Sequence, residues 1–238
     1  MFKLIKKLKK EKEIKISEER INKLNRAITS FEIHSEIKGD FQEFIKNFRD
    51  TSLIMLILGR RGAGKTALGM KLIEAGKILN KNPYVLGFGS SKVPKWIKKA
   101  DNIEKIPNNS LVLVDEAGIS FSSRESMNKS NKFLASLLAI ARHKNLSLVF
   151  VTQNSGMLDL NVLRLCDILI FKEPSLLQTR FERKGLQDIF GKVSEEFKKI
   201  DKEKKNYSYI ISDDFEGVIK SGLPEFWNES ISKSFSKR

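Results

Sequence analysis

One glycine-rich segment constrains the fold of this chain more than any other feature. Its residues are, in order, Gly59, Arg60, Arg61, Gly62, Ala63, Gly64, Lys65 and Thr66, which match the pattern G-x-x-x-x-G-K-[ST]. The apolar run 53–58 precedes this motif, and residues 67–78 after it can form a helix. A strand, a glycine-rich turn and a helix in this order predict a phosphate-binding loop rather than an ordinary turn.

The residue types of the motif suit a nucleoside triphosphate. Its glycines let successive backbone N–H groups point at phosphate oxygens, and the amino terminus of the following helix adds positive potential. We expect Lys65 to bridge the terminal phosphates and the Thr66 hydroxyl to ligate Mg²⁺. Arg60 and Arg61 either add phosphate contacts or face solvent, and both interpretations stay open. The expected cofactors are therefore ATP and Mg²⁺.

Two carboxylates follow a second apolar segment, 111–114. Asp115 and Glu116 come at the carboxyl end of this expected strand, where the ligands of parallel sheets gather. Asp115 is suited to hold Mg²⁺, directly or through its water shell, and Glu116 to accept a proton from an attacking water. The two residues are the expected metal ligand and general base.

A third apolar segment, 146–151, leads into Thr152 and Gln153. The amide of Gln153 can sense the terminal phosphate or orient the attacking water, whereas a plain position in a surface loop is the alternative. Because ligands gather at strand carboxyl ends, the position favours the sensor role.

Short apolar runs alternate with helical stretches after residue 50, which predicts an α/β fold with a mostly parallel sheet flanked by helices. The expected strands are 53–58, 83–87, 111–115, 146–152 and 167–171, and the expected helices are 65–79, 129–144 and 177–200. A short helix capped by Asp40, a hairpin from 207–211 and 217–219, and a last helix at 225–232 complete the prediction. The expected units are a basic helical extension (1–50), an ATPase core (51–206), and a hairpin and helix packed on the core (207–238).

The motif, the acidic pair and the polar strand tip, in this order, resemble the additional-strand, catalytic-glutamate division of P-loop NTPases. Residues 141–145, 148–153 and 163–167 are similar to the corresponding segments of the HerA/FtsK superfamily of DNA-pumping ATPases. The likeness is nearest to viral genome-packaging ATPases and zonula-occludens-toxin-like ATPases, and it covers about residues 50–175. It implies a RecA-like sheet with strand order 5-1-4-3-2.

The same resemblance implies an arginine that acts on a neighbouring subunit. In that superfamily, an arginine just before the fourth strand reaches the nucleotide of the next subunit, and Arg142 stands in that place. The alternative for Arg142 is a helix-end cation that complements the helix dipole, and Arg124 is the reserve candidate. The implied assembly is a homo-oligomeric ring, for which a hexamer is one option.

The charge of the chain favours a polyanionic partner. The formal net charge is +15, which predicts attraction to double-stranded DNA. However, 33 of the 44 basic residues are lysines, so a biased genome composition also accounts for part of this excess. Residues 1–15 carry seven lysines against two glutamates and form either a basic amphipathic helix or a frayed tail. Within this segment, residues 1–12 are the candidate for peripheral membrane contact.

Several classes of protein are excluded by composition. A single cysteine, Cys166, rules out an internal disulfide framework and an all-cysteine zinc site. With only two histidines besides, a metal held by protein side chains alone is not expected unless carboxylates hold it. The apolar run 53–58 is too short to cross a membrane, and the amino terminus is too charged for a secretory signal. We therefore expect a cytoplasmic protein without a transmembrane segment or, if it is viral, a protein of the virion or of the host cytoplasm.

Three functional hypotheses remain. The first is an ATPase motor that translocates or packages double-stranded DNA, which accounts for the charge, the motifs and the size together. The second is a morphogenesis or extrusion ATPase that acts at a membrane, and the third is a regulator that binds ATP but hydrolyses it slowly.

Overall fold

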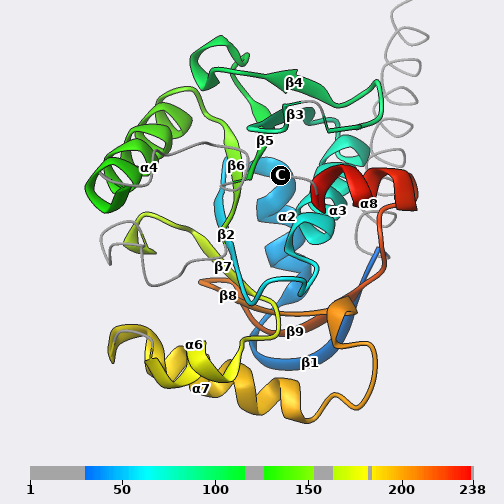
Figure 1. Ribbon diagram of the computed structural model, residues 1–238, viewed down its shortest axis with the longest axis vertical. Helices are drawn as coiled ribbons and strands as arrows, with labels where there is room; N and C mark the ends of the chain where they lie inside the picture. The colour runs from blue at the N-terminus through cyan, green and yellow to red at the C-terminus, as the bar shows by residue number, and fades with distance from the viewer. Residues whose placement is uncertain (1–29, 90, 116–125, 153–162, 182–183, 237–238) are drawn as a thin grey trace, which may run out of the picture.

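The computed structural model describes residues 30–89, 91–115, 126–152, 163–181 and 184–236. These residues form one nine-stranded sheet with helices packed against it (Figure 1). The strands are β1 (Phe31–Gly39), β2 (Ile54–Leu58), β3 (Asn82–Leu86), β4 (Lys98–Ala100), β5 (Ser110–Asp115), β6 (Ser147–Val151), β7 (Ile168–Phe171), β8 (Tyr207–Ser212) and β9 (Phe215–Ser221). The helices are α2 (Phe41–Asp50), α3 (Lys65–Ile78), α4 (Ser126–His143), α6 (Leu176–Phe181), α7 (Lys184–Lys198) and α8 (Glu229–Ser236), with 3-10 turns η1 (Ile103–Lys105) and η4 (Lys204–Asn206).

The strand order confirms the expected topology. Across the sheet the strands run β1-β9-β8-β7-β2-β6-β5-β3-β4, and β7, β2, β6, β5 and β3 are parallel to one another. Numbered along the chain as strands 1 to 5, these parallel strands stand in the order 5-1-4-3-2. The central strand β2 is buried along its whole length, which explains its uninterrupted apolar sequence.

Helices cover both faces of the sheet and build two separate cores (Figure 1). Alternate residues of each strand point to opposite faces, so Leu56 packs toward α4 and α7, whereas Ile57 packs toward α2 and α3. These three layers are typical of an α/β fold with a buried parallel sheet.

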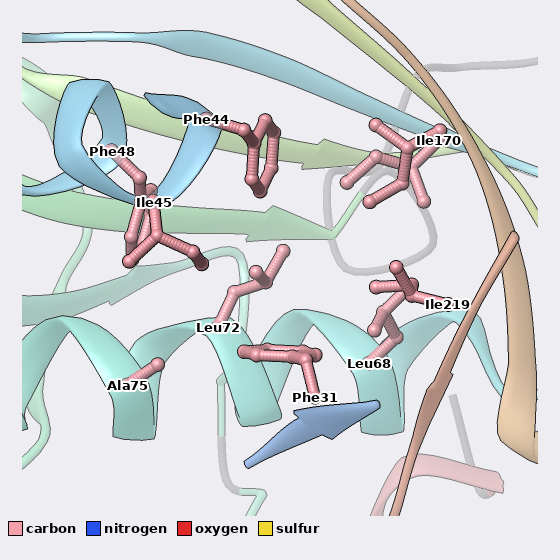
Figure 2. Close-up of a pocket in the computed structure, with 10 residues that line it drawn as sticks. Phe31, Phe44, Ile45, Phe48, Leu68, Leu72, Ala75, Ile170 and Ile219 are labelled. Carbon is pink, nitrogen blue, oxygen red and sulfur yellow. The ribbon is translucent and has the colours of Figure 1, made fainter. Parts of the chain in front are cut away.

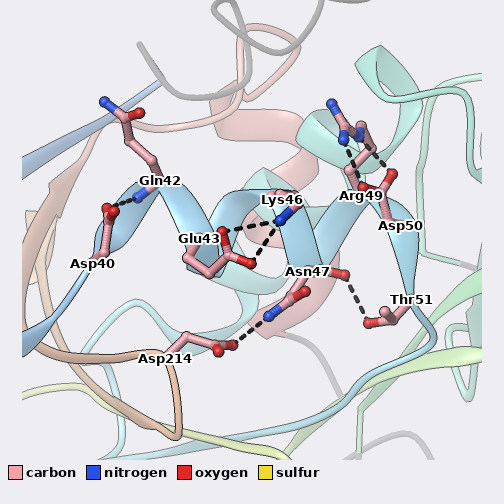
Figure 3. Close-up of polar contacts among 9 residues, drawn as sticks. All are labelled: Asp40, Gln42, Glu43, Lys46, Asn47, Arg49, Asp50, Thr51 and Asp214. Atoms are coloured by element: carbon pink, nitrogen blue, oxygen red, sulfur yellow. Dashed lines mark hydrogen bonds and ion pairs between the residues drawn. The ribbon is translucent and has the colours of Figure 1, made fainter.

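Helix α2 is fixed at both ends by polar contacts (Figure 3). Asp40 caps its amino terminus by accepting a hydrogen bond from the backbone N–H of Gln42 at 2.7 Å, as its sequence predicts. Near the other end, the Asn47 side chain donates to Asp214 in the β8–β9 turn at 2.8 Å, and the Thr51 hydroxyl donates to the Asn47 carbonyl. The helix is thereby attached to the hairpin as well as to the core.

The core under α2 leaves one small apolar cavity of about 10 Å³ (Figure 2). Ten apolar side chains surround it: Phe31, Phe44, Ile45, Phe48, Leu68, Leu72, Ala75, Ile170, Ile210 and Ile219. A space of this size holds about one water molecule, and no polar lining would retain it. The cavity therefore belongs to the packing of the core and is no ligand site.

Some expectations about the ends of the chain need correction. Residues 31–39, placed in a helical extension, form the edge strand β1, which pairs antiparallel with β9. Their apolar residues alternate with polar ones, as at Phe31 and Ile33, and this period suits a strand. The expected helix 177–200 is replaced by two helices, α6 and α7. The last helix begins at Glu229 because Asn228 caps it, accepting a hydrogen bond from the backbone N–H of Ile231.

The hairpin of β8 and β9 forms as predicted and extends the sheet beyond β7. Strand β4 is an addition that the sequence analysis did not contain. Within the part of the chain that the structure describes, no helix has the length and apolar character needed to cross a membrane.

Candidate nucleotide-binding site

The glycine-rich motif forms a tight loop between β2 and α3. The backbone has positive φ angles at Gly59 (145°), Gly62 (76°) and Gly64 (89°), a region that side chains disfavour. Helix α3 begins at Lys65, and its N-cap residue Gly64 provides no side-chain cap. The amino terminus of α3 therefore points its backbone donors and its positive dipole end at the loop, as phosphate binding requires.

The side chain of Lys65 lies inside this loop. It is 5% exposed, and its Nζ donates to the carbonyl oxygens of Gly59 at 2.8 Å and Arg60 at 2.9 Å. The ammonium group is thus held within the curve of the loop, where it can neutralise phosphate charge.

Thr66 and Asp115 meet beside the loop, as the predicted metal site requires. The Thr66 hydroxyl donates to a carboxylate oxygen of Asp115 across 3.3 Å, and Asp115 is buried at the carboxyl end of β5. A hydroxyl and a carboxylate are hard oxygen donors that fit Mg²⁺, which retains several waters and phosphate oxygens as its other ligands. Among the described residues, no group of three or more histidine, cysteine or acidic side chains is placed to hold a metal ion. A metal at Thr66 and Asp115 would therefore need water and phosphate oxygens as further ligands.

Three candidate residues, Glu116, Gln153 and Arg124, lie outside the described residues, so their roles stay predictions. The strand ends that precede two of them are described. Asp115 pairs with Val151 in the β5–β6 register, and the following Thr152 is buried and donates its backbone N–H to Ile57 of β2 at 3.2 Å. The chain therefore enters both segments from adjacent strand ends next to the loop.

Arg142 lies near the amino-terminal ends of the parallel strands, whereas the phosphate loop follows the carboxyl end of β2. Its guanidinium donates to the carbonyl oxygen of Leu165 at 2.8 Å and lies 3.4 Å from Asp167. Asp167 in turn accepts from the backbone N–H of Ile54, where β2 begins. Since β2 has five residues, its first and last Cα atoms are about 13 Å apart. The structure thus does not bring Arg142 to the loop of its own chain, and the role on a neighbouring subunit stays a prediction.

Lys172 is a buried cation beside the loop that the sequence analysis did not identify. It directly follows β7, is 1% exposed, and donates through Nζ to the carbonyl oxygens of Lys205 at 2.5 Å and Tyr207 at 2.7 Å. Burial lowers the pKa of Lys172 to about 7. One sequence signal could have indicated Lys172: it is a charged residue directly after an apolar segment, the same pattern that drew attention to Asp115.

Glu173 attaches the loop to the segment before β8. Its carboxylate accepts hydrogen bonds from the guanidinium of Arg60, with Nε at 3.2 Å, and lies 3.7 Å from the ammonium of Lys204. The guanidinium of Arg60 is therefore paired with an acidic partner, while its backbone remains part of the loop. The neighbouring Arg61 is exposed.

An open cleft of about 440 Å³ borders the loop on this side. Residues of the loop, of α6, of α7 and of η4 line it, among them Arg60, Glu173, Leu177, Phe197 and Lys204. Its volume lies within the range of small-molecule sites, and it combines apolar with charged walls. It offers space next to the loop for the part of a nucleotide that lies outside the phosphate site.

Comparisons with known proteins concern the family and the fold of the chain. The family model described as zonular occludens toxin (Zot) matches residues 69–206, which is more than half of the chain and begins just after the loop. A search of curated protein sequences found no match.

Solved structures show the same fold at low sequence identity. The DNA-packaging ATPase B204 of Sulfolobus turreted icosahedral virus is 17% identical, with a TM-score of 0.51 over 73% of this chain and 99% of its own. The genome-packaging NTPase B204 of Sulfolobus turreted icosahedral virus 2, in complex with ATPγS, is 16% identical, with a TM-score of 0.51 over 73% and 100%. The pCW3 conjugation coupling protein TcpA, in its monomer form with ATPγS, is 10% identical, with a TM-score of 0.51 over 79% and 65%. The fold of the chain is that of the P-loop NTPases.

Proposed function

Because the chain belongs to the zonular occludens toxin (Zot) family, we propose that it is an ATP-hydrolysing motor that translocates double-stranded DNA. The observation that carries the catalytic half of this proposal is the meeting of Lys65, Thr66 and Asp115 at one end of the parallel sheet. A cation, a hydroxyl and a carboxylate around a glycine-rich loop suit a triphosphate and its metal better than any other ligand.

In the proposed reaction, the loop and Lys65 bind the phosphates of ATP and neutralise their charge. Mg²⁺, held by Thr66 and Asp115, supplies further charge neutralisation when bound. Glu116 accepts a proton from a water molecule oriented by Gln153. The water oxygen bonds to the γ-phosphorus while the bond from that phosphorus to the bridging oxygen breaks, which gives ADP and phosphate.

Two observations support DNA as the moved polymer. The chain carries a net charge of +15, which attracts a polyphosphate backbone. Its structural relatives with TM-scores of 0.51 include proteins described as a DNA-packaging ATPase and a conjugation coupling protein.

We also propose a ring in which Arg142 serves the nucleotide of the next subunit. Arg142 lies at the edge of the sheet opposite the loop, so within one chain it is remote from the phosphates. A neighbouring copy that presents its loop to this edge would receive the guanidinium, which stabilises charge on the transferring phosphoryl group.

The test is ATP hydrolysis by the full chain with and without linear double-stranded DNA. We expect turnover that rises with DNA and loses this stimulation at high salt, because the contacts are to phosphates. Lys65→Ala is the control for the site. ATP hydrolysis that DNA of any length leaves unchanged would argue against a DNA motor.

A membrane-associated extrusion ATPase is the second candidate, favoured by the seven lysines against two glutamates in residues 1–15. Such a protein would bind vesicles that contain anionic lipids. Deletion of residues 1–12 would abolish this binding and leave hydrolysis intact. Vesicle binding that stimulates turnover in place of DNA would favour this function.

A further inference from the structure

The stem of Lys172 packs against both ends of the phosphate loop. Its backbone N–H donates to Leu58, the last residue of β2, at 2.8 Å. A Cβ atom placed on Gly59 would lie 2.8 Å from Cβ of Lys172, and one on Gly64 would lie 3.7 Å from its Cε. The approach to Gly59 is so close that only glycine fits there, and it involves Cβ and the backbone of Lys172. The contact that depends on the long lysine side chain is that of its Cε with Gly64.

Among the described residues, the hydrogen-bond acceptors of Nζ of Lys172 all lie in the segment 205–208. It donates to the carbonyl oxygens of Lys205 at 2.5 Å and Tyr207 at 2.7 Å, and to the Ser208 hydroxyl at 3.3 Å. Three acceptors match the three N–H groups of a lysine ammonium, and such pairing is what makes burial of the group tolerable. The hydrogen bonds of one buried amino group thus fix this segment at the loop.

Glu173 provides a second, more exposed connection between the phosphate loop and the segment that precedes β8. Glu173 pairs with Arg60 in the loop and with Lys204 in η4. A Cβ atom on Gly64 would also lie 3.4 Å from the carbonyl oxygen of Lys205, so the segment itself borders the loop.

We propose that Lys172 is a positioning residue of the phosphate site, which holds residues 205–208 against the phosphate loop and keeps the loop in the shape that receives a triphosphate. Its kinetic consequence rests on the proposed function. The role of Lys172 in holding the shape of the loop does not rest on that function, because this role can be measured without nucleotide.

The first experiment is amide hydrogen exchange of the nucleotide-free full chain, compared between the wild type, Lys172→Met and Lys205→Met. Lys205→Met is the matched control, because only its backbone carbonyl accepts the bond from Lys172. We expect faster exchange in Lys172→Met at both 59–66 and 205–208, by about tenfold, and wild-type exchange in the control. Faster exchange at 205–208 alone would overturn the proposal, since the lysine would then support the hairpin without shaping the loop.

The second experiment measures ATP hydrolysis by the same proteins. Loss of a preformed loop weakens binding of substrate and transition state alike, so we expect KM to rise about tenfold while kcat changes little. A purely structural role would instead lower kcat through loss of folded protein and leave KM unchanged. Should Lys172→Met fail to fold, Ser208→Ala removes one acceptor and leaves the lysine, and we expect a smaller rise in KM and in loop exchange.

The two proposals fail in different ways. A wild-type chain that binds no ATP refutes the proposed function, while the exchange comparison still decides the role of Lys172. A wild-type chain that hydrolyses ATP, with unchanged KM and loop exchange in both Lys172→Met and Ser208→Ala, refutes the role of Lys172 alone.

Discussion

The hydroxyl of Thr66 lies 3.3 Å from the carboxylate of Asp115, although 49 positions separate the two residues in the sequence. Thr66 lies in the first turn of α3, just after β2, and Asp115 ends β5. These two strands are not neighbours in the sheet, because β6 lies between them. The helices that follow the two strands pack on opposite faces of the sheet, α3 on one and α4 on the other, so the two connections leave in opposite directions at the carboxyl ends of the strands. The strand order itself therefore creates the site in which the two oxygen donors meet.

We expect Asp115→Asn to lose metal-dependent turnover. The amide keeps the size of the side chain and an acceptor for the Thr66 hydroxyl but removes the negative charge that attracts Mg²⁺. ATP hydrolysis measured against Mg²⁺ concentration should fall at least about 100-fold at any concentration tested. Asp101→Asn changes an exposed carboxylate and should match the wild type. An unaltered Mg²⁺ dependence in Asp115→Asn would remove this residue from the metal site.

Lys65→Ala should abolish the stabilisation that nucleotide gives to the folded chain. A ligand at 100 times its Kd stabilises the native state by about 2.7 kcal/mol, which raises the melting temperature. In thermal unfolding with ATPγS and Mg²⁺, the wild type should show this shift and the variant should not. Lys46→Ala, which removes an exposed lysine of α2 away from the cleft, should keep it. An equal shift in Lys65→Ala would mean that the nucleotide binds elsewhere.

The centre of the fold was predictable because its signals are local. Strand β2 is buried on both faces and is therefore continuously apolar, and the loop after it requires glycine at Gly59 and Gly64 for their positive φ angles. The position of Asp115 next to the loop was predictable from two signals together: it ends an apolar segment, and it follows Lys65 by fifty residues with one expected strand between them. An acidic residue at the end of a strand would alone be a weak signal, since any strand may end in an acidic turn. The resemblance to known ATPases then supplied the strand order, which local patterns do not contain.

The remaining features depend on contacts between distant parts of the chain. Strand β1 carries charged residues on a sheet edge, so its sequence resembles the lysine-rich and glutamate-rich segment before it. The burial of Lys172 is created by a segment 33 residues later, and nothing near this lysine in the sequence indicates those acceptors. Arg142 was assigned by resemblance alone, and its contacts within the chain fit a structural role at the opposite edge equally well.

Cys166 should react slowly with thiol reagents in the folded chain. Burial, reinforced by the neighbouring Asp167, raises the pKa of its thiol to about 12 from 9.0, so very little thiolate exists at pH 8. Because this is the only cysteine, a disulfide reagent such as DTNB reports on it alone. We expect a rate at least about 100-fold below that of the chain unfolded in guanidinium chloride. Equal rates in the two states would show that the thiol is accessible and ionisable.

The same shift predicts how stability changes with pH. Above pH 9 the unfolded chain loses the thiol proton while the folded chain retains it up to about pH 12, so the unfolded state binds fewer protons and folding is weakened as pH rises. Cys166→Ala removes this contribution. Urea unfolding of both proteins between pH 7 and 10 should show the wild type losing stability relative to the variant above pH 9, and parallel curves would contradict the raised pKa.

Arg142→Ala distinguishes action on a neighbouring subunit from a structural role in its own chain. The variant should bind ATP and lose at least about 100-fold in turnover, because an arginine at the transferring phosphoryl group acts on the transition state. Lys65→Ala is inactive for a different reason, since it cannot bind the phosphates. When the two are mixed in equal amounts and reassembled, some interfaces join an intact loop from one variant to an intact Arg142 from the other. For random assembly this fraction is about a quarter, so activity should return to about that share of the wild type. If Arg142 only secures Leu165 and Asp167 within its own chain, mixing restores nothing, and the variant should instead unfold at a lower temperature.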